Sequence, residues 1–104
     1  MSWREAGHIK EFEEQDRKRV DAGDGRIILL FKIGDEYWAI NNRCSHENAS
    51  LALGERDGYE IMCPLHGSRF DIRTGKNLSL PAVEPVDRFD VKVEEGRIFV
   101  QIGT

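Results

Sequence analysis

The sequence predicts an all-β fold, a small antiparallel sandwich or barrel. Short runs of apolar and β-branched residues recur along the 104-residue chain, and dipeptides containing glycine separate them. Near the C-terminus, two of these runs alternate apolar and polar residues, as half-buried strands do. Short strands with regular turn signals are typical of small sandwiches and barrels.

The first predicted hairpin joins residues 27–33 to residues 37–40. The earlier run, Ile27–Ile33, is apolar and rich in β-branched side chains, which favours a strand. Gly34-Asp35 interrupts this run, and Tyr37–Ile40 then resumes it. A tight turn between two such runs is typical of a β-hairpin.

Two further turns organise the second half of the chain. Asp57-Gly58 precedes the predicted strand Tyr59–Met62. Residues 89–94 alternate, Glu95-Gly96 forms a turn, and residues 97–102 alternate back, which predicts a final hairpin. The expected core includes the aromatic side chains at strand spacing: Phe31, Trp38, Phe89 and Phe99.

The N-terminal segment is less regular. Residues 11–19 are dense in charges of both signs and are compatible with a short helix or with an edge strand that enters Val20. We interpret this segment as a solvated face and not as a binding motif. Trp3 fits either the core or the surface, and His8 is expected at the surface.

Composition indicates one globular domain, residues 1–104. The chain is 39% hydrophobic and 33% charged, which is typical of a soluble protein. No apolar run approaches the length of a membrane span, and Met1–Glu5 does not resemble a signal peptide. We therefore expect a cytoplasmic protein without a membrane partner. The formal charge of −4 argues against nucleic acid, whose phosphates would repel the chain.

Two short motifs carry most of the chemical information. Cys44-Ser45-His46 and Cys63-Pro64-Leu65-His66 use both cysteines of the chain and two of its three histidines. Each motif supplies one thiolate and one imidazole within loop-forming sequence. This pattern suits a [2Fe–2S] cluster in which one iron takes both thiolates and the other takes both imidazoles.

Two other interpretations of these four residues remain. A structural zinc site also uses two Cys and two His, but its motifs usually pair like ligands in sequence. A disulfide between Cys44 and Cys63 would leave His46 and His66 without a role. Zinc can also occupy such a site artefactually, because thiolate and imidazole suit it as well.

The two motifs and their flanks resemble the cluster-binding loops of Rieske proteins. The resemblance is carried by residues 44–49 and 63–71, with Thr74-Gly75 and Pro81-Ala82 at the expected places, and it extends from about Ile27 to the C-terminus. It implies the Rieske fold, in which antiparallel sheets carry an inserted two-loop cluster-binding subdomain, here at about residues 41–82.

The resemblance also implies the ligands and their surroundings. Cys44 and Cys63 would hold the inner iron of the [2Fe–2S] cluster, and His46 and His66 would hold the outer iron nearest the surface. Further residues of the family pattern would surround the cluster: Pro64, Gly67, Ser68, Phe70 and Pro81.

Departures from the high-potential members of the family predict a low reduction potential. Ala49 and Leu65 stand where those members have a disulfide that joins the two loops. Ser68 matches a serine whose hydroxyl donates to the cluster, although it can instead satisfy a backbone group of the loop. Phe70 replaces a tyrosine and has no hydroxyl to donate, which removes a bond that favours the reduced state.

A free-standing Rieske domain of this length resembles the ferredoxin of bacterial multicomponent oxygenases. The resemblance implies a one-electron carrier, with a flavin-containing NAD(P)H-dependent reductase as donor and a terminal, ring-hydroxylating oxygenase as acceptor. No enzymatic site of its own is expected, because His8 alone cannot complete a mononuclear iron site and no Gly-x-Gly-x-x-Gly motif is present. A monomer is expected. The alternatives are a small subunit of a nitrite-reductase-like complex and a cluster-based redox sensor.

Overall fold

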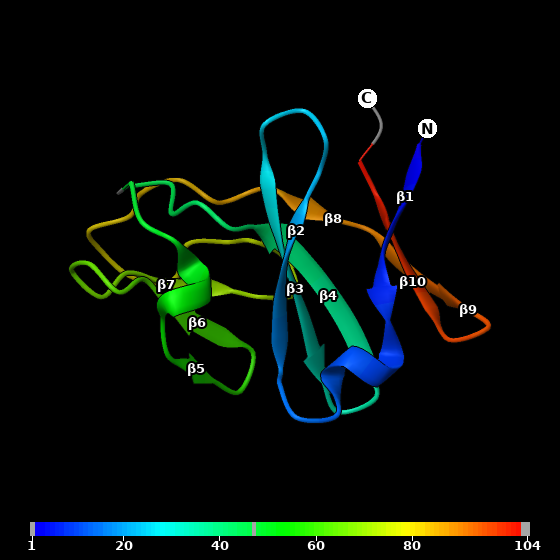
Figure 1. Ribbon diagram of the computed structural model, residues 1–104. Helices are drawn as coiled ribbons and strands as arrows, with labels where there is room; N and C mark the ends of the chain where they lie inside the picture. The colour runs from blue at the N-terminus through cyan, green and yellow to red at the C-terminus, as the bar shows by residue number, and fades with distance from the viewer. Residues whose placement is uncertain (1, 47, 103–104) are drawn as a thin grey trace.

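The computed structural model describes residues 2–46 and 48–102. Over these residues it contains strands and two short 3-10 helices, which confirms the all-β prediction (Figure 1). In chain order the elements are β1 (Trp3–His8), helix η1 (Ile9–Phe12), β2 (Arg17–Asp21), β3 (Ile27–Ile33), β4 (Glu36–Asn41), helix η2 (Leu51–Leu53), β5 (Arg56–Asp57), β6 (Glu60–Met62), β7 (Arg69–Asp71), β8 (Arg88–Phe89), β9 (Val91–Glu94) and β10 (Arg97–Gln101).

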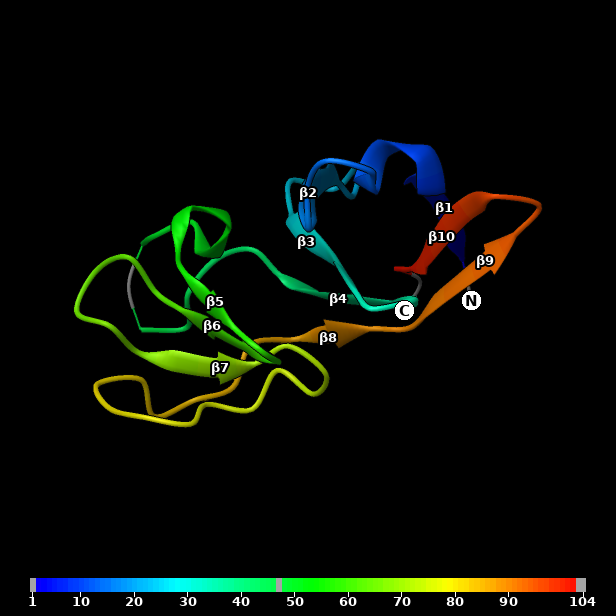
Figure 2. The same ribbon diagram turned by 90° about the horizontal axis from the view of Figure 1, so that it is seen from below.

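Three antiparallel sheets follow one another along the molecule. Their strand orders are β1-β10-β9, β2-β3-β4-β8 and β5-β6-β7. Figure 2 shows the β2-β3-β4-β8 sheet in the middle, with the other two sheets on opposite sides of it. No described helix is long and apolar enough to cross a lipid bilayer.

The central sheet is buried on both faces, which explains the continuous apolar run in β3. Leu29 and Phe31 belong to a core shared with the β5-β6-β7 sheet, and Ile28 and Leu30 belong to a core shared with β1 and β10. Successive side chains of a strand point to opposite faces. A strand with both faces covered therefore needs apolar residues at every position rather than at alternate positions.

The predicted hairpins are confirmed. Strands β3 and β4 pair in register, with Phe31 opposite Trp38. Strand β6 pairs with β5 across the turn that contains Asp57-Gly58. The C-terminal hairpin pairs β9 with β10, and Ile98 lies opposite Val93. Among the four aromatic core candidates, Phe31 and Phe89 are buried, whereas Trp38 and Phe99 are half-buried.

One predicted strand is divided between two sheets. The alternation of residues 89–94 suggested a single strand, but the chain changes sheets at Asp90. Phe89 pairs with Ala39 in the central sheet, whereas Val91 pairs with Val100 in the β1-β10-β9 sheet. Alternation persists through the crossover because the chain stays extended, so the pattern alone does not reveal the change of partner.

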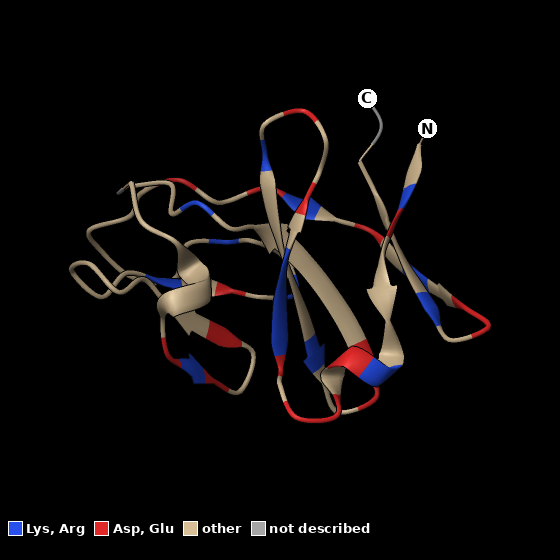
Figure 3. Ribbon diagram, viewed as in Figure 1, with Lys and Arg blue, Asp and Glu red and all other residues tan. Residues whose placement is uncertain are grey.

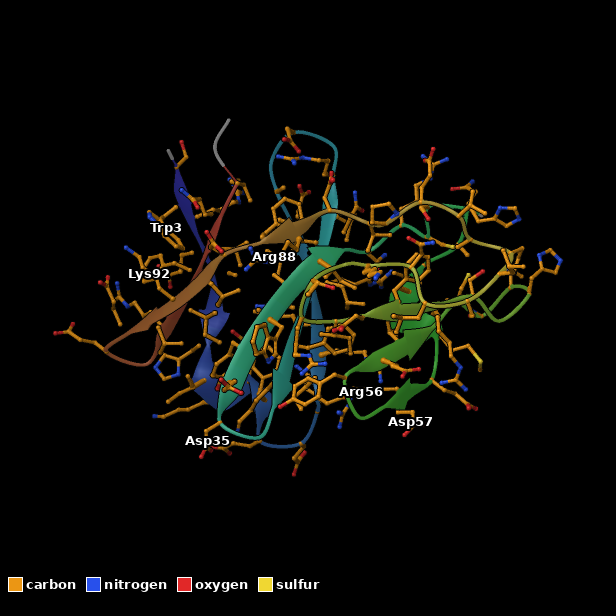
Figure 4. The ribbon with its side chains drawn as sticks, turned by 180° about the vertical axis from the view of Figure 1, so that it is seen from behind. Trp3, Asp35, Arg56, Asp57, Arg88 and Lys92 are labelled. Carbon is orange, nitrogen blue, oxygen red and sulfur yellow. The ribbon has the colours of Figure 1, made fainter. Side chains whose placement is uncertain are left out.

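The N-terminus contains a strand that the sequence analysis did not anticipate. Trp3 pairs with Gln101, which adds β1 to the edge of the C-terminal hairpin. Trp3 is exposed, and the ammonium of Lys92 lies 4.5 Å from its ring centre (Figure 4). Segment 11–19 contains both a helical part and a strand, because it includes the end of helix η1 and the start of β2.

His8 is half-buried at the surface and has a local structural role. Its Nδ1 accepts a hydrogen bond of 3.2 Å from the backbone N–H of Lys10, and the Glu11 carboxylate accepts one of 2.8 Å from the backbone N–H of His8. The two bonds form a reciprocal cap on helix η1.

Candidate metal centre

The first motif lies in loop 1, residues 44–50, which follows β4. The backbone N–H of Cys44 donates a 3.0 Å hydrogen bond to the carbonyl of Ala49, and Arg43 and Ser50 form an isolated β-bridge that closes the loop. Within this turn Cys44 is only 2% exposed, whereas His46 is exposed. The loop therefore presents its thiol to the interior and its imidazole to the surface.

Asn42 shapes the base of loop 1, although the sequence analysis did not single it out. Its buried side-chain oxygen accepts a 3.0 Å bond from the backbone N–H of Ala52, and its amide nitrogen donates a 2.9 Å bond to the Ser50 hydroxyl. Buried polar side chains are usually satisfied in this way. In the sequence, this role was indicated by an asparagine at the end of an apolar strand, where its side-chain amide can form hydrogen bonds that stabilise a turn.

The second motif lies in loop 2, residues 63–68, which connects β6 to β7. The backbone N–H of Cys63 donates a 2.7 Å bond to the carbonyl of Ser68, so the loop is closed in the same manner as loop 1. Cys63 is 1% exposed and His66 is exposed. Pro64 is exposed within the turn.

Two consecutive residues of loop 2 have positive φ. Gly67 has φ of 75°, a conformation that glycine adopts readily, and His66 has φ of 66°. A non-glycine residue rarely adopts this region. A Cβ at Gly67 would lie 3.8 Å from the Met62 sulfur, so it is the conformation, and not lack of space, that favours glycine there.

The two cysteines meet in one core. Cys44 and Cys63 belong to the same buried group as Phe31, Phe70 and Ile72. Neither cysteine is joined in a disulfide, so the structure does not support that interpretation. Among the described residues, no group of three or more Cys, His, Asp or Glu side chains is arranged to hold a single metal ion.

The donor set fits a [2Fe–2S] cluster. Each loop offers one buried thiol and one exposed imidazole, which corresponds to an inner iron with sulfur ligands and an outer iron with nitrogen ligands. Buried thiolates are costly unless a cation compensates their charge, which a metal centre supplies. That Cys44, His46, Cys63 and His66 are the ligands stays a prediction.

A third loop, residues 77–85, contacts the other two. It contains Pro81, whose peptide bond with Leu80 is cis. The backbone N–H of Ala82 donates a 3.0 Å bond to the Ser68 hydroxyl oxygen, and both residues are buried. Ser68 thus has the backbone partner that was one of its two expected roles, and donation from its hydroxyl to the cluster stays a prediction.

Phe70 lies deep in the core. It is fully buried and forms an isolated bridge with Asn77 at the start of the third loop. It also belongs to the buried group that contains both cysteines. A ring without a hydroxyl therefore occupies the core that contains both cysteines.

The surface around the two histidines is poor in charge. In sequence, loops 1 to 3 contain only two charged residues, Glu47 and Glu84. Figure 3 shows these loops mostly tan, while the charged residues concentrate on the strands and the outer turns. Leu65, Leu80 and Val83 are exposed large apolar side chains of the same loops. A cavity of about 320 Å³ opens beside loop 1, and Cys44 and His46 are in its lining.

Comparison with known proteins agrees with this arrangement. The Rieske [2Fe-2S] domain family model matches residues 2–90. The 3-phenylpropionate/cinnamic acid dioxygenase ferredoxin subunit of Escherichia coli (strain K12) is 41% identical over 95 residues, which cover 90% of this chain and 88% of that protein.

Solved structures resemble the whole fold. The ferredoxin of carbazole 1,9a-dioxygenase from Nocardioides aromaticivorans IC177 superposes with a TM-score of 0.88 and 35% identity, covering 96% of this chain and 97% of that one. A complex of reduced oxygenase and oxidised ferredoxin in carbazole 1,9a-dioxygenase contains a chain with a TM-score of 0.88 and 32% identity, covering 94% and 91%. The protein therefore belongs to the Rieske [2Fe–2S] domain family, and the relatives named above are ferredoxins of oxygenase systems.

Proposed function

We propose that the chain carries single electrons through a [2Fe–2S] cluster held by Cys44, Cys63, His46 and His66. The observation that carries this proposal is the sorting of ligands: both thiols are buried in one core, and both imidazoles are exposed. Buried thiolates on one iron and surface imidazoles on the other would place the electron near the protein surface.

The protein's own residues control where the electron enters and leaves. When bound, the cluster supplies a one-electron couple, at higher potential than in all-cysteine ferredoxins because neutral imidazoles replace two thiolates. Loop 1 and loop 2 expose His46 and His66, so the imidazole edges can contact a partner directly. The core around Cys44 and Cys63 excludes water from the sulfur ligands.

We propose a terminal oxygenase of the ring-hydroxylating type as acceptor and a flavin-containing NAD(P)H-dependent reductase as donor. The relatives support the acceptor: one is named as a dioxygenase ferredoxin subunit, and another was solved in complex with its oxygenase. The exposed Leu65, Leu80 and Val83 beside the histidines suit a small apolar contact. Weak redox encounters bury less than about 1,200 Å², which favours rapid exchange of partners by a monomer.

We also propose that the chain functions as one domain, with a cluster-binding subdomain at about residues 41–82. The β5-β6-β7 sheet and both motif loops lie within this range, and the core around Leu29 joins it to the central sheet. A reducing compartment such as the cytoplasm suits two cysteines that must act as thiolates.

Electron paramagnetic resonance (EPR) tests the cluster assignment. Anaerobically purified protein is expected to be silent when oxidised and, after dithionite, to show a rhombic signal with low average g, at two irons and two sulfides per chain. Protein that contains one zinc, no sulfide and no signal after iron–sulfide reconstitution would contradict the proposal.

The acceptor is tested separately, because a cluster can be correct while the partner is wrong. Dithionite-reduced protein, freed of excess reductant, is mixed anaerobically with oxidised terminal oxygenases of aromatic dioxygenases, including the carbazole enzyme. Return of the oxidised visible spectrum supports the acceptor class. Protein with an intact reduced EPR signal that transfers to none of these oxygenases would rule the class out.

A further inference from the structure

Loop 3, residues 77–85, is built as a stiff segment. It contains two of the three prolines of the chain, Pro81 and Pro85, and the proline ring restricts φ. Ala82, near its middle, is buried in the core that contains both cysteines. Leu80 and Val83, on either side, are 76% and 71% exposed. The loop is therefore fixed on one side and faces solvent on the other.

One end of this loop is joined to loop 1. The hydroxyl of Ser45, between the predicted ligands Cys44 and His46, donates a 2.6 Å hydrogen bond to the backbone carbonyl of Glu84. The backbone N–H of Val86, just beyond loop 3, donates a 2.8 Å bond to the carbonyl of Gly75. The contact with Ser45 thus reaches a segment that is itself anchored.

The other end is joined to loop 2 and the strand that follows it. The buried Ser68 hydroxyl accepts from Ala82, as described above. The Ser79 hydroxyl accepts a 2.9 Å bond from the backbone N–H of Arg69, the first residue of β7. The backbone N–H of Leu78 donates a 2.7 Å bond to the carbonyl of the same arginine. The hydroxyls of Ser45 and Ser68 therefore join loop 3 to loops 1 and 2, and the hydroxyl of Ser79 joins it to β7.

The chain has no cysteine to spare for a covalent link between loops 1 and 2, because its only two cysteines are the predicted ligands. We propose that loop 3 replaces such a link as a hydrogen-bonded clasp, with Ser45 as the positioning residue that holds loop 1 to it. This inference rests on the proposed function, because its consequence is retention of the cluster. Opening the clasp would let the two ligand loops separate and expose the irons to solvent.

The first test compares Ser45→Ala with Ser45→Thr in the cluster-loaded protein. Iron release to an excess of a strong chelator is followed by the loss of visible absorbance. We expect release from Ser45→Ala to be about twofold to tenfold faster than from the wild type, the range for one neutral hydrogen bond. Ser45→Thr keeps a hydroxyl and should restore the slow release. Equal rates for wild type and Ser45→Ala would overturn the inference.

A double variant tests whether the contacts act as one device. Ser79→Ala removes a bond at the opposite end of loop 3. If the clasp works in series, Ser79→Ala should add little to a protein that already carries Ser45→Ala, because the loops are then already uncoupled. If the double variant releases iron at a rate increased by the product of the two single effects, the two contacts are independent and the clasp proposal is wrong.

Hydrogen exchange separates a local effect from general destabilisation. In Ser45→Ala the amide of Ala82 should exchange faster, while the amides of Leu29 and Leu30 in β3 should be unchanged. Faster exchange in β3 as well would mean that the substitution weakens the whole fold and would overturn the positioning role. The wild-type EPR spectrum tests the proposed function separately. If the wild type lacks the Rieske signal, the proposed function is wrong. If the wild type shows the signal, a negative result in the iron-release or exchange experiments contradicts only the clasp.

Discussion

Two regions of the molecule are ordered by different means. The basal region is formed by the β2-β3-β4-β8 and β1-β10-β9 sheets, and the loop region is formed by the β5-β6-β7 sheet and loops 1 to 3. Basal strands run to seven residues in β3, and their side chains fill two aliphatic cores. Strands of the loop region have two or three residues. Short strands bury little apolar surface alone, so this region is also held by turns, by serine hydroxyls and by the core that it shares with the central sheet.

Folding and function are therefore assigned to separate parts of one small chain. The basal region has a core formed by apolar side chains, whereas the core that the loop region shares with the central sheet contains both buried cysteines. One face of β3 packs in the core with the cysteines and the other face packs in the core of the basal region, so substitutions on the two faces test the two regions separately.

The largest effect is expected from removing a predicted ligand. Cys63→Ser or His66→Ala should abolish the Rieske EPR signal, because in either variant one of the two irons loses one of its two protein ligands. The basal region should keep its strands, which far-ultraviolet circular dichroism and hydrogen exchange in β3 can show. The matched control His8→Ala should retain the signal, since His8 only caps helix η1. A ligand variant with an unchanged signal would refute the assignment.

Adjacent residues of β3 sharpen the division between the regions. Leu29 and Leu30 are both fully buried, but Leu29 faces the core with the cysteines and Leu30 faces the other core. Either leucine-to-alanine change should cost about 2–5 kcal/mol in unfolding free energy. Only Leu29→Ala should also speed iron release or alter the EPR line shape. Identical cluster behaviour in both variants would mean that the two cores are not functionally distinct.

Phe70 offers a smaller and more specific effect. Phe70→Tyr should raise the midpoint potential by about 20–60 mV if the new hydroxyl donates to a ligand sulfur, because such a bond favours the reduced cluster. Protein-film voltammetry measures this shift. Phe89→Tyr is a control in the other core and should leave the potential unchanged. A folded Phe70→Tyr protein with the wild-type midpoint would remove this explanation of a low potential.

The smallest effect concerns the contact between the regions at Asp16. Hydrogen bonds from Arg17 and, after it, from Arg56 of β5 lower the pKa of its carboxyl below the usual value of 3.8, against the opposing effect of burial. The ionised carboxylate therefore stabilises the fold above about that pH, and this contribution is lost as the pH falls through the lowered pKa.

Carboxyl carbon shifts in nuclear magnetic resonance titrations measure the Asp16 pKa directly. Arg17→Gln should raise it more than Arg56→Gln, because Arg17 makes the larger contribution. The accompanying loss of stability at neutral pH should be at most about 1 kcal/mol, since the pair is partly exposed. A larger rise in Arg56→Gln would show that the bond between the two regions dominates.

Local patterns in the sequence were enough for several elements. The hairpin of β3 and β4 followed from two apolar runs and a glycine turn, because tight turns pair their own neighbours. The Cys-His motifs predicted the two loops, since each motif brings its own turn residues.

Other features could not be predicted from such patterns. Strand β1 pairs with β10 at the far end of the chain, and no local signal in Trp3–His8 names that partner. The change of sheet at Asp90 was hidden by uninterrupted alternation. Ser45 looked like a spacer between two ligands until the fold brought the carbonyl of Glu84, 39 residues away, within 2.6 Å of its hydroxyl.

The sequence by itself determined the chemistry of this protein: two thiols, two imidazoles and the short turns that hold each pair. Such information is local, because ligand type and turn conformation depend on neighbouring residues. Only the tertiary structure decided that both thiols face one core, that both imidazoles face solvent and that loop 3 joins the two ligand loops. These features depend on contacts between segments distant in sequence, which form when the central sheet buries both of its faces.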